Sequence, residues 1–257
     1  MGAGAKESAA EALDAEDDLG ESARESTFAR ALAQGSKAGR ARALRSLGKW
    51  LAARGDGIGD SDLRKVWQGL FYAMWHADKA PVQRDVARRM ARLVRTTPGD
   101  SAPLRYLAAF LGTMRREWWG IDKLRLDKYM MLSRSVCTEG VALLASRGWD
   151  ERSVSVLADA LRYSVLRPGG KAGRPALGFQ LHATDCFLDA LKAGAAAGAG
   201  EGHGDGRVPG EALAALVAPF AEALAEEQTP GPLAGRVASE VLERLAAAVA
   251  GEEEGGE

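Results

Sequence analysis

Apolar side chains at helical spacing are the feature that most constrains the fold of this chain. Between Leu63 and Trp75, seven large apolar residues recur three or four positions apart, which puts them on one face of an α-helix. The same spacing returns between Gly- and Pro-containing turns, and no segment shows convincing β-strand alternation. The sequence therefore predicts an all-α fold of antiparallel helix pairs. In 257 residues, such pairs can stack as a curved HEAT- or armadillo-like domain, although no clean internal repeat is found.

Composition divides the chain into a helical region and two flanking tails. Residues 1–26 are rich in Ala, Gly, Glu, Asp and Ser and contain few large apolar side chains, so they are predicted to form a disordered acidic tail. Residues 27–250 are predicted to hold the helical domain, and residues 251–257 a second acidic tail. Within the domain, the Gly- and Ala-rich stretch at about 194–210 is predicted to be a flexible linker.

The stretch Met114–Arg134, MRREWWGIDKLRLDKYMMLSR, differs most from a generic alanine-rich helix. It contains the adjacent Trp118 and Trp119, then a Gly-Ile-Asp turn in which Asp122 is predicted to cap the next helix. The side chains of that helix expected to face inward are Leu124, Leu132, Val136 and Leu143, with Met131 and Leu144 alongside. Those expected to lie mostly outside, or against a neighbouring helix, are Lys123, Arg125, Asp127, Lys128 and Arg134.

Five of the six tryptophans carry different expectations. Core packing is expected for Trp50, Trp67 and Trp75, which follow helical apolar patterns. For Trp118 and Trp119, core packing and surface exposure are equally compatible with the sequence.

The formal net charge of −1 hides a strong internal polarity. Basic and acidic residues number 2 and 8 in residues 1–27, 22 and 9 in residues 28–134, and 10 and 18 in residues 135–257. The three parts therefore carry net charges of −6, +13 and −8. Such a basic first half suggests a polyanion or an acidic protein as its partner, unless the charges compensate one another within the fold.

Basic side chains are predicted to gather on the outer faces of several helices of the first half. In two of these helices, three or four basic residues lie opposite an apolar stripe. If those faces adjoin, they form a phosphate-binding strip on which a tryptophan can stack an unpaired base. The alternative is a solvated set of faces with internal ion pairs. The candidate RNA- or partner-binding residues are Arg42, Arg45, Lys49, Arg84, Arg88, Arg92, Arg95, Arg115, Arg116, Trp118, Trp119, Lys123, Arg125 and Lys128.

Signatures of catalysis or of metal binding are missing from the sequence. Cys137 and Cys186 are far apart, and the three histidines form no metal-binding pair at helical spacing. No phosphate-binding loop, nucleophile elbow or apolar run of membrane-spanning length occurs. We therefore expect no enzyme, metal, cofactor, small-molecule substrate or membrane, although catalytic groups that converge from distant positions stay possible.

Two segments resemble a known family. Trp67–Gln83 and Met114–Arg134 are similar to the most distinctive blocks of the nucleolar ribosomal RNA processing protein 1 family, also called the Nop52 family. Further similarity lies in Leu44–Arg54, Arg147–Asp150 and Leu177–Leu191, so that the resemblance covers roughly residues 28–245. It implies an α-helical, repeat-like domain and offers no catalytic residue to carry over.

The resemblance also implies a function. It indicates a non-catalytic ribosome biogenesis factor in the nucleus and nucleolus, acting in precursor ribosomal RNA processing and in assembly of the large (60S) subunit within the pre-ribosome. Its expected partners are precursor ribosomal RNA and large-subunit assembly factors. The alternative is a helical adaptor that binds acidic partner segments without direct RNA contact. Strong, salt-sensitive RNA binding by residues 28–134 would distinguish the first from the second.

Overall fold

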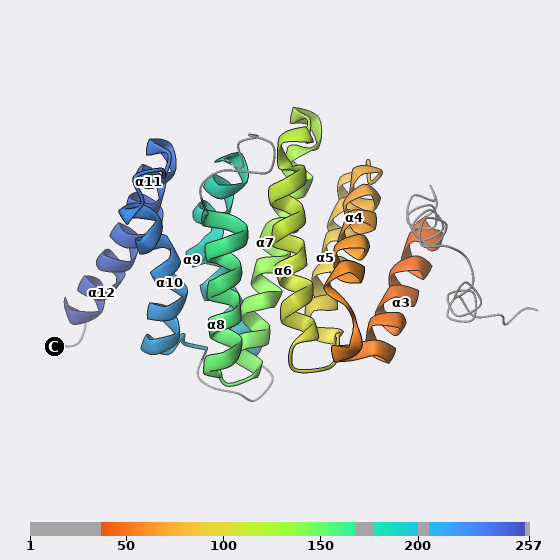
Figure 1. Cartoon of the computed structure of the whole chain (residues 1–257), viewed down its shortest axis with the longest axis horizontal. Helices are drawn as coiled ribbons and strands as arrows, with labels where there is room; N and C mark the ends of the chain where they lie inside the picture. Colours follow the sequence, from red (N-terminus) through yellow and green to blue (C-terminus); the bar gives the residue numbers. More distant parts are fainter. Residues whose placement is uncertain (1–36, 168–176, 200–205, 255–257) are drawn as a thin grey trace, which may run out of the picture. The chain divides into compact units, whose positions relative to one another are not determined.

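The computed structural model describes residues 37–167, 177–199 and 206–254, and every regular element in these ranges is a helix (Figure 1). This confirms the predicted all-α class. The tail predicted for residues 1–26 lies outside the described residues. Of the tail predicted for 251–257, residues 251–254 are described and belong to the last helix, so the sequence placed the end of that helix too early.

The elements follow one another without strands in the described ranges. The α-helices are α3 (Lys37–Arg54), α4 (Asp60–Trp75), α5 (Ala80–Thr96), α6 (Ala102–Glu117), α7 (Lys123–Ser146), α8 (Glu151–Ala160), α9 (Leu177–Ala199), α10 (Gly210–Ala225), α11 (Gly231–Val237) and α12 (Arg244–Glu254). Two 3-10 turns, η1 (Gly55–Gly57) and η2 (Trp118–Gly120), and two π-helical segments, η3 (Leu161–Leu166) and η5 (Ala238–Glu243), complete the order.

The chain divides into two compact units, Met1–Ala109 and Phe110–Glu257, called unit 1 and unit 2 below. The boundary falls inside α6. That residues 27–250 form one domain, stacked as a curved HEAT- or armadillo-like array, stays a prediction.

Unit 1 is built around a buried tryptophan. Trp67 of α4 is almost fully buried, its Nε1–H donates to the carbonyl oxygen of Tyr106 at 2.8 Å, and the two rings pack 4.8 Å apart. This confirms the core position predicted for Trp67. Trp50 and Trp75 are only half-buried, and the guanidinium of Arg54 lies over the Trp50 ring at 4.6 Å. Rings at the edge of the core thus keep one side open to solvent.

A carboxylate from the η1 turn caps the start of α6. The two oxygens of Asp56 accept four hydrogen bonds of 2.7–2.9 Å, from the backbone N–H groups of Asp100, Ser101 and Ala102 and from the Ser101 hydroxyl. These bonds, led by that of the Ala102 N–H, hold the pKa of Asp56 well below its ordinary value. Gly99, with φ of 104°, makes room for this carboxylate, because a Cβ there would lie 2.5 Å from its Oδ1.

Unit 2 is held together by the contact between α7 and α9. A Cβ on Gly194 would lie 2.5 Å from Val141 Cβ, and one on Gly198 would lie 2.4 Å from Ala145 Cβ. Both contacts advance by four residues in the same direction, so α7 and α9 run parallel. Because α8 contacts α10 while α9 contacts both α7 and α11, the helices of unit 2 form two layers (Figure 1). This arrangement is compatible with HEAT-like stacking.

The same contact corrects the linker predicted at about 194–210. Residues 194–199 form the last turns of α9, because the small side chains that suggest a linker also allow two helices to approach closely. Residues 200–205 lie outside the described ranges.

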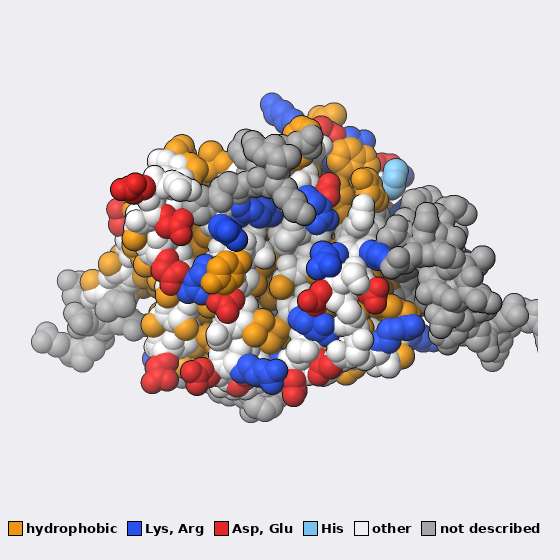
Figure 2. Space-filling view, viewed as in Figure 1, with side chains coloured by type: hydrophobic (Ala, Val, Ile, Leu, Met, Phe, Trp, Pro, Cys, Tyr) orange, Lys and Arg blue, Asp and Glu red, His pale blue; other side chains and the backbone are white. Residues whose placement is uncertain are grey.

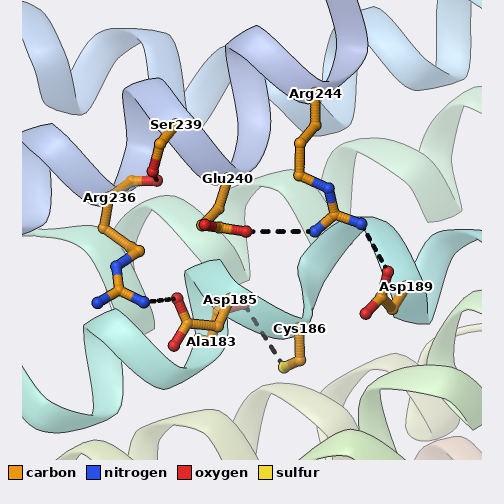
Figure 3. Close-up of polar contacts among 8 residues, drawn as sticks. All are labelled: Ala183, Asp185, Cys186, Asp189, Arg236, Ser239, Glu240 and Arg244. Atoms are coloured by element: carbon orange, nitrogen blue, oxygen red, sulfur yellow. Dashed lines mark hydrogen bonds and ion pairs between the residues drawn. The ribbon is translucent and has the colours of Figure 1, made fainter. Parts of the chain in front are cut away.

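Ion pairs fasten the C-terminal helices to α9, as Figure 3 shows. Arg236 reaches Asp185 at 2.8 Å, and Arg244 reaches Asp189 at 2.8 Å and Glu240 at 3.4 Å. All five side chains are partly exposed, so each pair contributes at most about 1 kcal/mol. Val237 and Val241, both fully buried, supply the apolar part of this contact.

We expect Gly194→Ala to destabilise the protein by about 1–3 kcal/mol, the usual cost of overpacking a close contact. The matched control is Gly112→Ala in α6, where a Cβ meets nothing within 4 Å. Alanine there is expected to be neutral or to stabilise by up to about 1 kcal/mol, because it favours the helix. Urea unfolding followed by circular dichroism measures both variants. Equal free energies of unfolding would contradict the close α7–α9 contact.

We expect Asp56→Asn to lower the melting temperature at neutral pH, since a neutral amide is a weaker acceptor for the bonds that cap α6. The unfolded chain binds a proton at this site near pH 4, whereas the folded chain keeps the carboxylate ionised. The stabilisation is therefore complete above about pH 5 and declines as the pH falls below about 4. Thermal unfolding at pH 7 and pH 3 should show a smaller difference from wild type at pH 3. Asn at the exposed Asp78 is the control, and an identical pH profile for the two variants would refute the cap.

Candidate nucleic-acid interface

Six exposed basic side chains of unit 1 form the first candidate surface. We define the α3–α5 basic face as Arg42, Arg45, Lys49, Arg84, Arg88 and Arg92. Helix α3 packs against α5, and a Cβ on Gly48 would lie 3.3 Å from Leu93 Cδ2, which marks the seam between them. Figure 1 shows the two helices running in the same direction.

Helical geometry places Arg45, Lys49 and Arg92 nearest this seam, whereas Arg88 and Arg84 lie about 140° and 180° from Leu93 around α5. At about 100° per residue, the surface of α3 turns from buried Leu44 through Gly48 to exposed Arg45 and Lys49. Around the axis of α5 the order runs in the opposite rotational direction, from buried Met90 through Leu93 to Arg92 and then Arg88. For two parallel helices, opposite senses bring the exposed arcs to the same, outer side of the seam. The sequence predicted the exposed basic residues of each helix, and the contact between α3 and α5 brings the two sets to the same side.

The α3–α5 basic face lacks compensating carboxylates. In the part of the chain that the structure describes, none of its six side chains forms a hydrogen bond or an ion pair. The nearby Asp85 accepts from Arg89 Nε at 2.9 Å, so its charge is directed to another arginine. Arg95, which the sequence placed in the same stripe, is half-buried and interacts with another residue, so it does not belong to the face. Uncompensated guanidinium groups of this kind suit phosphate oxygens.

The candidates of unit 2 lie around η2 and the start of α7, and several have structural roles. The Arg115 guanidinium donates to the carbonyl oxygens of Val165 at 2.7 Å and Arg167 at 2.5 Å, which satisfies the end of η3. Burial, followed by the charge of Arg167, lowers the pKa of Arg115. The guanidinium of Arg125 pairs with Asp122, which accepts the Arg125 backbone N–H at 3.1 Å and so confirms the predicted N-cap.

The two adjacent tryptophans differ in burial. Trp118 is 8% exposed and packs 5.2 Å from the Phe179 ring and 5.6 Å from the His182 ring. Its Nε1 lies 2.8 Å from the position of a Cβ on Gly178, so only glycine fits there. Trp119 is 54% exposed. Of the two rings proposed to stack on a base, only Trp119 presents a face to solvent.

Two predictions about α7 are wrong, and they have one cause. Leu124, expected in the core, is 95% exposed, and Lys128, expected mostly outside, is 5% exposed. Leu132 is buried, as predicted, and eight residues at about 100° each place Leu124 about 80° from it around the helix. Lys128 lies only about 40° from Leu132, so the buried stripe passes through the lysine. Its aliphatic stem packs well in such a position.

The remaining candidates of unit 2 are at the surface. Arg116 is exposed and pairs with Glu117 at 2.8 Å, and Lys123 is exposed at the first position of α7. With Trp119 and Leu124 they form what we call the η2–α7 corner, where two large apolar groups and two cations lie within nine residues, 116–124. Sequence reasoning missed Leu124. That the η2–α7 corner and the α3–α5 basic face belong to one continuous strip stays a prediction.

The side chains with reactive potential are arranged as ordinary core or surface groups. Burial raises the pKa of Cys186 to about 11, and burial followed by the charge of Cys186 raises the pKa of Cys137. Neither thiol forms a disulfide, and both are protonated at neutral pH. His182 donates from Nε2 to the Met130 carbonyl oxygen at 3.1 Å, and burial lowers its pKa. No group of residues suited to hold a metal occurs in the described ranges.

Other surfaces of unit 2 mix charges of both signs. Over α8 and α10, Figure 2 shows acidic, basic and apolar side chains interspersed. Arg162, for example, reaches Asp159 and Glu222 at 2.5 Å each. None of the described helices is long and apolar enough to cross a membrane.

Comparisons with known proteins place the chain in a family. The protein-family model described as "Nucleolar protein, Nop52" matches residues 23–257. The chain is 42% identical over 174 residues to ribosomal RNA processing protein 1 homolog A of Mus musculus, an alignment that covers 66% of this chain and 35% of that protein. The human homolog A is 39% identical over 173 residues, covering 65% of this chain and 37% of the relative.

A fruit-fly protein is similar over a comparable stretch. The Drosophila melanogaster ribosomal RNA processing protein 1 homolog is 32% identical over 177 residues, which are 67% of this chain and 25% of that protein. The aligned region thus spans about a quarter to two fifths of the length of these relatives. Since the family model covers nearly the whole chain, the predicted family and its nucleolar character are confirmed: the chain belongs to the Nop52 family of nucleolar proteins.

Proposed function

We propose that this protein is a non-catalytic ribosome biogenesis factor that acts in precursor ribosomal RNA processing and in assembly of the large ribosomal subunit. In this proposal it works within the pre-ribosome, where precursor RNA and large-subunit assembly factors are its partners. The names of its relatives support a role in ribosomal RNA processing. The α3–α5 basic face supports direct contact with RNA.

The observation that carries the RNA contact is the absence of counter-charges on this face. Six cations lie on two packed helices, and none of them has an ion-pair partner among the described residues. Along each helix the cations span about 10–12 Å, enough to meet several phosphates. Arginine binds phosphate through two parallel N–H donors, and five of the six side chains are arginines. Association through such a face falls steeply as the salt concentration rises.

A second candidate function rests on the η2–α7 corner. The exposure of Trp119 and Leu124, 54% and 95%, is unusual for large apolar side chains and is typical of protein docking sites. This observation favours an adaptor that also binds assembly factors, with the exposed Lys123 beside the two apolar groups to meet acidic groups of the partner. The two surfaces belong to different units, so one protein can use both.

We expect Arg45→Gln, Lys49→Gln, Arg88→Gln and Arg92→Gln together to weaken RNA binding by about tenfold or more near 100 mM salt. Fluorescence anisotropy of a labelled RNA hairpin measures the affinity across salt concentrations. The salt slope should fall by about three to four, because each lost phosphate contact removes about one unit. The melting temperature should change little, since these side chains are exposed.

The matched control removes four exposed cations that lie off the face, with Arg64→Gln, Lys79→Gln, Arg152→Gln and Lys192→Gln. It lowers the net charge equally and should weaken binding by no more than about twofold. Equal effects of the two variants would show that only overall charge matters and would overturn the RNA face. Ultraviolet crosslinking in cells then identifies the RNA, and recovery of large-subunit precursor RNA at residues 37–109 is the expected result.

We expect Trp119→Ala with Leu124→Ser to reduce recovery of assembly factors in affinity purification while RNA binding by the purified protein changes by less than about threefold. The reason is that apolar anchors dominate protein interfaces, whereas phosphate binding depends mainly on charge. Tyr72→Ser removes another exposed aromatic side chain, in unit 1, and serves as the control. Undiminished recovery of all partners by the Trp119 and Leu124 variant would remove the adaptor function.

A further inference from the structure

The N-terminal part of the sequence has the charge that the α3–α5 basic face lacks. Eight acidic residues lie within residues 1–27, accompanied by two basic ones, and that part contains few large apolar side chains. In the described residues the six cations of the face have no ion-pair partner. A segment of net charge −6 thus precedes, by the nine residues 28–36, the helix that bears half of a strongly basic surface.

From these observations we propose that the acidic N-terminal segment, residues 7–25, binds the α3–α5 basic face and competes there with RNA. This segment of the same chain occupies the face, and the contact lowers the affinity of the face for other polyanions. The proposal rests on the function proposed above, because it names a regulator of the same surface.

The length of chain between the two partners permits the contact. Helix α3 begins at Lys37, and eleven residues, 26–36, separate it from Glu25. These residues span at most about 36 Å when extended. The distance along α3 from Lys37 to Lys49 is about 18 Å at 1.5 Å per residue. The acidic residues can therefore reach every basic side chain of α3, and α5 packs directly beside it.

Covalent connection makes this contact effective although each ion pair is weak. Exposed ion pairs contribute at most about 1 kcal/mol each, and an untethered peptide of this composition would bind poorly. A short tether keeps the segment at an effective concentration of about millimolar, which turns binding into an intramolecular equilibrium. RNA has a higher charge density and can displace the segment, so that weak or short polyanions are excluded more than long ones.

Other acidic parts of the chain explain the observations less well. The C-terminal sequence GEEEGGE is also acidic, but it belongs to unit 2 and is more than 150 residues from α5 in the chain. The carboxylates nearest in sequence to the face, such as Asp85, are few, and Asp85 pairs with Arg89. Residues 7–25 combine the highest acidic content with the shortest tether.

The first test measures RNA binding by the full chain. One variant replaces the eight acidic residues by their amides, at Glu7, Glu11, Asp14, Glu16, Asp17, Asp18, Glu21 and Glu25. If the segment occupies the face for most of the time, affinity for a labelled RNA hairpin should rise about five- to tenfold near 50 mM salt. The gain should shrink to less than about twofold near 500 mM salt, where the internal contact is screened.

The matched control changes the net charge equally by replacing eight acidic residues of the C-terminal part with glutamine. These are Glu211, Glu226, Glu227, Glu243, Glu252, Glu253, Glu254 and Glu257. We expect less than about a twofold gain, because distant charges act only through screened long-range repulsion. An equal gain in both variants would overturn the proposal in favour of general repulsion, and so would measurable RNA binding by the wild-type chain with no gain in the N-terminal variant.

A second test needs no RNA and separates this proposal from the proposed function. A carbodiimide joins carboxylates directly to lysine amines that touch them, and Lys49 is the lysine of the face. Mass spectrometry of the treated wild-type protein should find residues 7–25 joined to Lys49 much more often than to the exposed Lys79. Replacing Arg45, Arg88 and Arg92 by glutamine should reduce these products at least about threefold.

The outcomes of the two tests are distinct. Products at Lys49 without RNA binding by any variant would support the internal contact and remove the RNA function. RNA binding through the face with Lys49 and Lys79 joined equally would preserve the function and overturn the internal contact.

Discussion

Most of the described helices bury one apolar stripe, and burial of these stripes decides where the charges lie. Helix α5 shows this most clearly, because Val86, Met90 and Val94 are buried while Arg88 and Arg92 are exposed on the opposite side. A guanidinium group cannot enter the core without a partner, whereas a methionine gains free energy there. The packing that stabilises unit 1 therefore also displays its cations. In this sense the candidate interface is a by-product of core formation.

Unit 2 uses a different device, the close approach of two helices through small residues. Gly194 and Gly198 leave no room for side chains between α9 and α7, so the backbone of one helix rests on the other. Gly178 serves the same purpose for the ring of Trp118. Because Trp118 is held inside, its neighbour Trp119 must turn outward across the η2 turn. A core constraint on one tryptophan thus creates an exposed anchor from the next.

Charge is distributed unevenly along the chain, with the basic residues of the α3–α5 basic face between two acidic parts. The acidic parts, residues 1–27 and 135–257, flank the basic part in sequence, and a net charge of −1 conceals the contrast. A surface without internal counter-ions attracts any polyanion within a Debye length, including segments of its own chain. Selectivity for one polyanion then depends on competition. Under the two proposals above, competition between the acidic segment and RNA for the basic face would make that contact adjustable.

The sequence by itself determined the helices, the class and the family, because apolar periodicity and capping residues act over a few neighbouring positions. It also identified the exposed basic residues of α3 and of α5, and Asp122 as the N-cap of α7. Only the tertiary structure decided which arcs adjoin, which tryptophan is exposed, that Lys128 takes the buried position expected of Leu124, and that residues 194–199 are helix. Those outcomes depend on contacts between residues distant in the chain, such as the 53 positions between Val141 and Gly194, and no local pattern records them.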